Sequence, residues 1–390
     1  MKKIIIVNNN LKVGGVQKSL CNLLWVLEGK YDITLYLFSR TGAYDGQLPE
    51  SVKVCTCSSL FRYLGVSQAE CAGKLRDRLL RGALAGLCRL LGRQAVLRLL
   101  LASQKKLPGE YDCAISFLHN GSSRAFYGGV NEFVLEKIQA RKKVAFLHCD
   151  YRNCGADYRQ TLRLYQKFDE IAACSDGCRQ AFLEVFPTLA DRCVTVVNCH
   201  RFDEIHRLAA DAPWVYEPGR IPVLSVGRLS REKGLERALL AVHQAIAQGI
   251  PVSYHLVGDG NQREALQALA QQLGIAEYVR FHGEQSNPYR FMTHAALLLV
   301  TSYHEAAPMV IDEAYCLGLP VFSVRTTSSE EMITRRGCGW VCENSQAAID
   351  ALLPQVLRDE TALHSMKEQL RALPVSNQTA QEQFFSLVGR

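Results

Sequence analysis

The chain has no long hydrophobic run and no recognisable export signal. It lacks any stretch of about 18 uncharged apolar residues, because four arginines interrupt its most apolar segment, residues 79–102. The amino end is basic and then apolar, but Asn8, Asn9 and Asn10 end the apolar run well short of a signal-peptide core. The sequence therefore predicts neither a membrane-spanning helix nor an exported protein, and a cytoplasmic location is expected.

The chain also lacks cysteine and histidine pairs with the spacing of metal ligands. Its 15 cysteines are an odd number in a large chain, which favours reduced thiols over a disulfide framework. Zinc sites usually need two cysteine pairs at a suitable distance along the chain, or one cysteine pair with a matching histidine pair. The chain has three close cysteine pairs, at positions 55 and 57, 174 and 178, and 338 and 342, but they show neither arrangement. No metal site is expected, and most cysteines should pack as small buried hydrophobes.

The composition and length indicate a globular protein of two domains. Of its 390 residues 48% are hydrophobic and 21% charged, which is enough apolar surface for sizeable cores. Short β-rich runs alternate with helical patterns, which is typical of a parallel sheet covered on both faces. The predicted strands are 3–7, 32–38, 52–56, 113–117, 144–147, 171–174 and 194–197, then 223–226, 253–257, 279–281, 297–301, 321–324 and 340–342.

The fold class predicted is α/β, with two tandem doubly wound Rossmann-like domains facing a cleft. The first domain is expected over 1–206 and the second over 221–390, with one alternative in which the last helix returns to the first domain. Residues 207–220 contain Asp211, Pro213, Pro218 and Gly219, which are residue types typical of an interdomain linker. Ligands are expected at the carboxyl ends of the strands.

Positive charge is concentrated in residues 74–106, which hold nine basic residues and one acid, whereas the whole chain has a net charge of +7. Between Leu79 and Leu91, apolar residues share one helical face and arginines lie opposite. Such a helix suits an anionic membrane surface, which would make the protein peripheral on the inner face of the membrane, or it is an ordinary helix packed on its own domain. Nucleic acid is not expected as a partner, because no interleaved aromatics or recognition motif accompany the charge.

The strongest local motif lies at residues 223–242. A predicted strand ends there in Gly227 and Arg228, and Lys233 and Gly234 precede a helix from about residue 235. Two cations beside a helix amino end favour a diphosphate, because peptide N–H groups, the helix dipole and the side-chain charges all attract an anion. The alternative is that both are solvated loop charges.

A second motif, residues 302–321, places two acids around the start of a helix. Glu305 lies in a loop and Glu313 in the helix, and Pro308 suits the first helical turn. The N–H groups near Met309 and Val310 are helix-start donors that can hold a phosphate. The arrangement suits a nucleotide sugar, with one acid for sugar hydroxyls and one for ribose hydroxyls, or else it is a helix-start acid and a surface acid.

In their order and spacing, four motifs resemble those of the family 4 glycosyltransferases of the GT-B fold. They are Gly227-Arg228 with Lys233-Gly234, Val257-Gly258-Asp259-Gly260, Phe281-His282-Gly283, and Glu305 with Glu313-Ala314. The resemblance covers nearly the whole chain and is most specific over 223–320. It implies that a sugar moves from a UDP- or GDP-linked donor, with retention of configuration and without metal or cofactor, to a saccharide or lipid-linked acceptor in cell-surface polysaccharide or glycolipid synthesis.

The resemblance also implies roles for the acids and cations of these motifs. Arg228 and Lys233 would hold the donor diphosphate and stabilise the charge that develops on the leaving group. Glu305 would bind the sugar hydroxyls, and Glu313 would bind the ribose.

Further roles implied by the resemblance fall on both halves of the chain. Gly283 and Glu284 would lie beside the nucleobase. Gly14 and Gly15 follow the first strand and would form a glycine loop that reaches toward the donor. His148 ends a predicted strand and would contact the donor sugar, although a strand-end histidine with a structural partner is the alternative.

The sequence departs from the family pattern at two places. Ala306-Ala307 stands where the family commonly has glycine and a larger residue, which leaves the identity of the donor sugar open. Val197-Asn198-Cys199 stands where many relatives have asparagine next to proline or glycine. Asp150 would orient His148 or contact the acceptor. The rival functions are an inactive GT-B-like binding protein and a nucleotide-sugar epimerase on the same fold.

Overall fold

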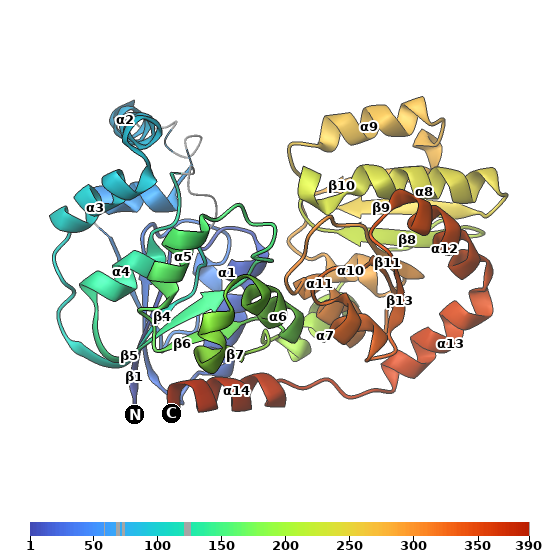
Figure 1. Ribbon diagram of the computed structural model, residues 1–390. Coiled ribbons are helices and arrows are strands. Elements are labelled where there is room, and N and C mark those ends of the chain that lie inside the picture. The colour runs from blue at the N-terminus through green and yellow to red at the C-terminus, as the bar shows by residue number, and fades with distance from the viewer. Residues whose placement is uncertain (58, 68–70, 72–74, 121–125, 390) are drawn as a thin grey trace. The chain divides into compact units, whose positions relative to one another are not determined.

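The computed structural model describes residues 1–57, 59–67, 71, 75–120 and 126–389, and it divides into two compact units (Figure 1). Unit 1 comprises Met1–Cys199 together with Asn377–Arg390, and unit 2 comprises His200–Ser376. Each unit is built on its own parallel sheet.

Unit 1 contains a seven-stranded sheet of order β3-β2-β1-β4-β5-β6-β7, in which every neighbouring pair is parallel. Its strands are β1 (Lys3–Asn8), β2 (Asp32–Leu37), β3 (Lys53–Thr56), β4 (Glu110–Ser116), β5 (Gln139–Leu147), β6 (Glu170–Ala173) and β7 (Cys193–Thr195). Its helices are α1 (Gly15–Val26), α2 (Leu75–Leu91), α3 (Arg93–Ser103), α4 (Val130–Lys137), α5 (Tyr158–Tyr165), α6 (Asp176–Val185) and α14 (Gln378–Gly389). Short 3-10 turns are η1 (Asp45–Gln47), η2 (Leu60–Gly65) and η4 (Pro187–Arg192).

The strands of unit 1 bury apolar side chains on both faces, as parallel strands between helices do. Ile4 and Ile6 of β1 pack on one face with Leu20 of α1 and Phe384 of α14, so the last helix completes the core of unit 1. On the other face, aromatic rings from β2, η2 and α4 pack together. The carboxyl ends of the strands lie at one edge of the sheet, where ligands of such sheets bind.

Unit 2 contains a six-stranded parallel sheet of order β10-β9-β8-β11-β12-β13. Its strands are β8 (Ile221–Val226), β9 (Val252–Val257), β10 (Val279–Gly283), β11 (Leu297–Val300), β12 (Val321–Val324) and β13 (Gly339–Cys342). Its helices are α7 (Phe202–Ala210), α8 (Leu235–Ala247), α9 (Arg263–Gln272), α10 (Tyr289–Met292), α11 (Met309–Cys316), α12 (Gln346–Arg358) and α13 (Glu360–Arg371), with short turns η5 (Arg231–Lys233), η6 (Ala276–Tyr278) and the π-helical η7 (Glu330–Thr334). Helices α8, α9 and α12 cover one face of the sheet, α7, α10 and α11 cover the other, and α13 contributes Leu363 to the first core and Leu370 to the second.

Residues 207–220, which the sequence predicts to be a linker, belong to unit 2 in the structure. Its start is the end of α7. Trp214 packs against His282 and Phe291, with ring centroids 4.9 Å and 5.1 Å apart, and the Tyr216 hydroxyl donates to the Phe291 carbonyl at 2.6 Å. The boundary between the units falls at Cys199 and His200, before the predicted position.

The basic segment forms two helices, and the amphipathic helix predicted between Leu79 and Leu91 lies within the first of them, α2. Gly92, with φ of 81°, separates α2 from α3, while Lys74 lies outside the described residues. Helix α3 buries four apolar side chains of unit 1, whereas α2 buries only Cys88 and lies beside α3 (Figure 1). None of the helices in the described ranges combines the length and the apolar character needed to cross a membrane.

Candidate functional site

Three motif glycines of unit 2 bring the carboxyl ends of β8, β9 and β10 into backbone contact. The Gly227 N–H donates to the Val257 carbonyl at 2.9 Å, and the Gly258 N–H donates to the Gly283 carbonyl at 2.8 Å. A Cβ atom on Gly258 would lie 1.9 Å from the Gly227 oxygen, so no larger residue fits there. The glycines of the three motifs are therefore explained by this close approach of loops.

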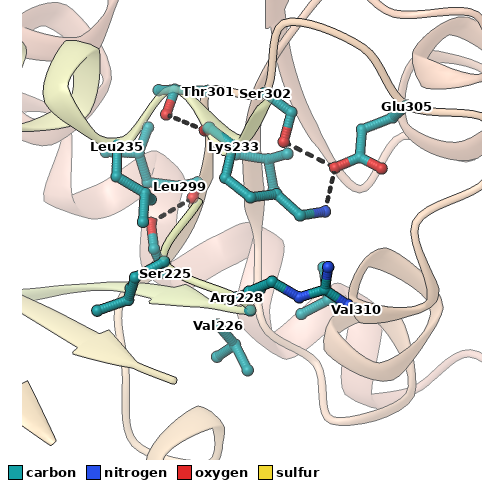
Figure 2. Close-up of a pocket in the computed structure, with 13 residues that line it drawn as sticks. Ser225, Val226, Arg228, Lys233, Leu235, Leu299, Thr301, Ser302, Glu305 and Val310 are labelled. Carbon is teal, nitrogen blue, oxygen red and sulfur yellow. Dashed lines mark hydrogen bonds and ion pairs between the residues drawn. The ribbon is translucent and has the colours of Figure 1, made fainter. Parts of the chain in front are cut away.

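A pocket lies next to these glycines, at the ends of β8 and β11 (Figure 2). Arg228, Lys233 and Glu305 reach it from two loops. The Lys233 ammonium pairs with the Glu305 carboxylate, Nζ to Oε1 2.6 Å, and the Ser302 hydroxyl donates to the same oxygen at 2.7 Å. Arg228 is exposed, and no residue of the described ranges forms an ion pair with it. With Val310 of α11, which also lines the pocket, the structure thus brings together four of the predicted site residues.

The position of Lys233 is fixed by the contact between Gly234 and the end of β11. Gly234 has φ of 57°, and a Cβ atom there would lie 2.4 Å from the Thr301 carbonyl oxygen. The Thr301 hydroxyl donates to the Gly234 carbonyl at 2.8 Å. It also lies 3.3 Å from the Lys233 carbonyl, as Figure 2 shows. The motif glycine is needed here because a side chain would push the lysine loop away from the strand.

The loop that carries Glu305 is held by polar groups that the sequence motifs did not single out. The Asn344 amide donates to the Tyr303 carbonyl at 3.1 Å and accepts from buried Arg237 at 2.6 Å. The Thr327 hydroxyl donates to the Glu305 carbonyl. Thr327 follows β12 and Asn344 follows β13. Their positions after strand ends are the one sequence signal that could have identified them.

The pocket has more positive than negative charge. Burial raises the pKa of the neighbouring Glu232, but the Ser230 hydroxyl, its own backbone N–H and the charges of Arg228 and Lys233 outweigh burial and leave that pKa lowered. Among the residues that line the pocket, Arg228 and Lys233 are the cations and Glu305 is the acid, while Glu232 lies near both cations outside the lining. An anion such as a diphosphate is the group that this balance of charge favours.

Helix α11 places the remaining predicted residues of this motif. It begins at Met309, so Pro308 stands immediately before the helix instead of in its first turn. Val310 lines the pocket, whereas Met309 and Glu313 are buried. At the third motif, Gly283 ends β10, and Glu284 follows as an exposed residue.

The sequence analysis missed a charge network beside Glu313, in which His200 is buried and Arg336 is partly exposed. His200 Nε2 lies 3.0 Å from Asp312 Oδ2, and Arg336 pairs with the other oxygen of the same carboxylate. Burial opposes ionisation of Asp312, but these two partners lower its pKa to about 2. The network ties the first residue of unit 2 to α11, across a sequence separation that no local pattern signals.

In unit 1, the predicted residues lie at the carboxyl ends of two strands. Gly15 begins α1, and the Gly14 carbonyl accepts from the Lys18 N–H at 3.0 Å. His148 follows β5 with its ring against those of Phe117 and Phe146, at centroid distances of 4.8 Å and 5.8 Å. Burial, and secondarily the charge of His119, lower the pKa of His148 to about 3, so its imidazole is neutral at pH 7.

Asp150 and the segment around Asn198 make local contacts within unit 1. The Asp150 carboxylate accepts from the Arg152 N–H at 3.1 Å and from the Asn153 amide at 2.7 Å, so it holds its own turn. Asn198 accepts from the Ser19 hydroxyl of α1 at 2.7 Å. Neither predicted role of Asp150 has a contact in the described ranges that supports it.

Two α/β units in tandem, each built on a parallel sheet, define the GT-B fold class. Solved structures with this architecture agree over the full chain. Anabaena Alr3699/HepE in complex with UDP-glucose has a TM-score of 0.70 at 18% identity, with 100% of both chains covered. WaaG, a glycosyltransferase involved in lipopolysaccharide biosynthesis, has a TM-score of 0.61 at 17% identity, covering 99% of this chain and 100% of WaaG. The predicted fold class of two tandem doubly wound domains is confirmed.

The sequence comparisons point to one family. Residues 212–372 match the family described as "Glycosyl transferases group 1". Lipopolysaccharide core biosynthesis glycosyltransferase LpsD of Rhizobium meliloti is 30% identical over 151 residues, which are 38% of this chain and 42% of LpsD. Lipopolysaccharide glucosyltransferase WaaG of Escherichia coli is 29% identical over 157 residues, 38% of this chain and 40% of WaaG. The chain thus spans less than half the length of these relatives, and over the matched region the resemblance to the glycosyltransferases that the four motifs predict is confirmed.

Proposed function

We propose that this chain is a retaining glycosyltransferase that uses a nucleotide-sugar donor in the synthesis of a cell-surface polysaccharide or glycolipid. The observation that carries the proposal is the pocket in which Arg228, Lys233 and Glu305 meet at the ends of β8 and β11, inside the region that matches the family. The names of the relatives, which concern lipopolysaccharide and colanic acid, support a saccharide or lipid-linked acceptor. The UDP-glucose complex of HepE supports a UDP-linked donor, with a GDP-linked donor as the alternative.

In the proposed reaction, the bond between the anomeric carbon and the diphosphate oxygen breaks, and its electron pair leaves with the nucleoside diphosphate. Arg228 and Lys233 stabilise the negative charge that develops there, which is the work that a metal ion does in other enzymes. The acceptor oxygen forms its bond to the same face of the anomeric carbon, and its proton passes to the departing diphosphate oxygen. No metal or cofactor takes part.

The other residues bind and orient the donor in this proposal. Glu305 binds the sugar hydroxyls and Glu313 the ribose. N–H groups at the start of α11 hold a phosphate oxygen, because the first N–H groups of a helix have no partner within it. From unit 1, the glycine loop that precedes α1 and the imidazole of His148 contact the donor.

The proposal is tested by thermal unfolding with UDP-, GDP- and ADP-glucose, followed by measurement of nucleotide release. A donor at about 100 times its Kd should stabilise the folded state by about 2.7 kcal/mol. Lys233→Ala should lose nucleotide release and most of the donor-induced shift while it keeps its fold. The control Arg231→Ala removes an exposed cation of the same loop and should change neither. Unchanged release by Lys233→Ala would refute the assignment.

The same measurement separates the two rival functions. An inactive binding protein would be stabilised by a nucleotide sugar but would release no nucleotide over hours. An epimerase would convert the sugar while it stays attached to the nucleotide. A transferase releases the nucleoside diphosphate and a free or transferred sugar.

A second proposal concerns the anionic membrane surface, and the exposure of α2 supports it. Leu75, Leu79 and Leu90 of this helix are 70%, 64% and 82% exposed. Arg76 and Arg89 are exposed on the same helix, so leucines can enter the lipid interface while arginines meet phosphate headgroups. The protein would then act as a peripheral protein on the inner, cytoplasmic face of the membrane.

Sedimentation with phosphatidylglycerol vesicles tests this surface. The protein should bind at low salt and dissociate at high salt, and a Leu79→Gln and Leu90→Gln double variant should bind more weakly with unchanged thermal stability. Equal binding of both proteins would reduce α2 to an ordinary surface helix.

A further inference from the structure

The backbone that leaves β11 connects the two loops of the unit 2 pocket. The Thr301 hydroxyl donates to the Gly234 carbonyl at 2.8 Å, next to Lys233 in the chain. The Ser302 hydroxyl donates to Glu305 Oε1 at 2.7 Å (Figure 2). The positions of both charged side chains in the pocket therefore depend on where this short stretch of backbone lies.

Arg237 of α8 holds the same backbone, although it does not line the pocket. Its Nη1 donates to the Thr301 carbonyl at 3.3 Å and to Asn344 Oδ1 at 2.6 Å. The Asn344 amide in turn donates to the Tyr303 carbonyl at 3.1 Å. One guanidinium and one amide thus fix the carbonyls on both sides of Ser302.

The burial of Arg237 is costly for a charged side chain. The residue is 5% exposed, and the Tyr303 ring covers its guanidinium, with 4.8 Å between Cζ and the ring centroid. No carboxylate of the described ranges forms an ion pair with Arg237, and its Nη2 has no hydrogen-bond partner there. A buried charge without an opposite charge opposes folding. An arginine kept at this cost, in contact with the backbone of the site, indicates a role in the site and not in stability.

We propose that Arg237 is a positioning residue for Glu305, and that Asn344 extends its hold to the next carbonyls. The inference rests on the proposed function, in which Glu305 binds the hydroxyl groups of the donor sugar. The two clamped carbonyls hold Ser302 where its hydroxyl orients the Glu305 carboxylate. A small displacement of that carboxylate weakens its hydrogen bonds to the sugar, which catalysis uses most in the transition state.

Two substitutions loosen the clamp without touching the pocket. Arg237→Lys keeps the charge and the aliphatic stem, but a single ammonium does not reproduce the planar fork of a guanidinium. Asn344→Ala removes the amide at an exposed position, so its fold should be unaffected. In both variants kcat for nucleotide release should fall about tenfold, with donor KM within about threefold of wild type, as for an interaction used in the transition state.

Combination with Glu305→Gln distinguishes positioning from a general structural role. If Arg237 acts through the carboxylate, its substitution has little left to disturb once that carboxylate is gone. Arg237→Lys and Asn344→Ala should therefore each lower release by less than about twofold in the Glu305→Gln background. Their effects on the melting temperature should be the same in both backgrounds.

Arg220 provides a matched control in the same unit. It precedes β8, at the end of the strand away from the pocket. Its guanidinium also lies over a tyrosine ring, 4.5 Å from the centroid of Tyr278, and donates to a backbone carbonyl, that of Glu277, at 3.3 Å. Arg220→Lys should release nucleotide at the wild-type rate.

Two results would overturn the inference while the proposed function stands. One is unchanged release in Arg237→Lys, and the other is a loss that multiplies in full with that of Glu305→Gln. If Arg237→Lys melts below the assay temperature, the same two outcomes in Asn344→Ala decide. If the wild-type protein releases no nucleotide from any donor, the proposed function fails and the inference fails with it.

Discussion

Glu305 forms an ion pair with the Lys233 ammonium, to which the donor diphosphate is proposed to bind. Its carboxylate lies 2.6 Å from Lys233 Nζ, so its negative charge repels a phosphate that binds the same ammonium. The side chains of Lys233 and Glu305 are 31% and 13% exposed, respectively. Partly exposed ion pairs of this kind contribute about 1 kcal/mol or less. Glu305→Gln removes the competing charge, while its amide oxygen can still accept from Ser302. We expect UDP to bind about fivefold more tightly to this variant, since 1.4 kcal/mol corresponds to a factor of ten.

The same substitution should have the opposite effect on turnover. A hydrogen bond from a sugar hydroxyl to a charged group contributes about 1.5–3 kcal/mol, so nucleotide release should fall roughly 10- to 150-fold. Calorimetric titration with UDP and a coupled assay of UDP release measure the two effects. The control Glu360→Gln removes one exposed acid from the same unit and should change neither. Weaker UDP binding by Glu305→Gln would refute the reasoning, because the carboxylate would then assist the phosphate instead of competing with it.

Three further predictions concern stability. Gly234→Ala should lower the melting temperature more than Gly249→Ala, since both have positive φ but only the first would clash with a neighbouring carbonyl; a smaller effect at 234 would contradict the close approach. Burial and a neighbouring imidazole lower the pKa of His255 to about 4, so the unfolded chain binds a proton that the folded chain does not between pH 6.5 and 4. Stability should therefore fall as the pH falls through this window, by at most about 3 kcal/mol, and urea unfolding of His255→Asn should show a smaller loss. Leu100→Ala should cost about 2–5 kcal/mol because Leu100 is 4% exposed, whereas Leu90→Ala should change the unfolding free energy by less than about 0.5 kcal/mol.

Strand positions could be read from the sequence because buried parallel strands are short, apolar and rich in branched residues. The run Ile4-Ile5-Ile6-Val7 forms β1, and Leu297–Val300 forms β11, with all four of its side chains buried. The motif loops could be read as well, since Gly227 and Gly234 occur where backbones approach closely. These features are local, and local patterns specify them.

Features that depend on distant contacts could not be read in this way. Pro213 and Gly219 suggested a flexible linker, but Trp214 between them packs against residues of β10 and α10, and nothing local signals that contact. A single glycine at 92, with φ of 81°, separates α2 from α3, and the charge pattern of the basic segment did not indicate this division.

Helix α14 has a consequence for the order in which the chain folds during synthesis. Its residues Phe384 and Leu387 complete the core formed by β1 and α1, yet the ribosome makes them after all of unit 2. The amino-terminal unit therefore emerges first but waits with an incomplete apolar face until translation has passed residue 387, while unit 2, which is continuous in sequence, can fold as soon as it is released. During that interval the nascent chain exposes a hydrophobic surface that a chaperone could recognise.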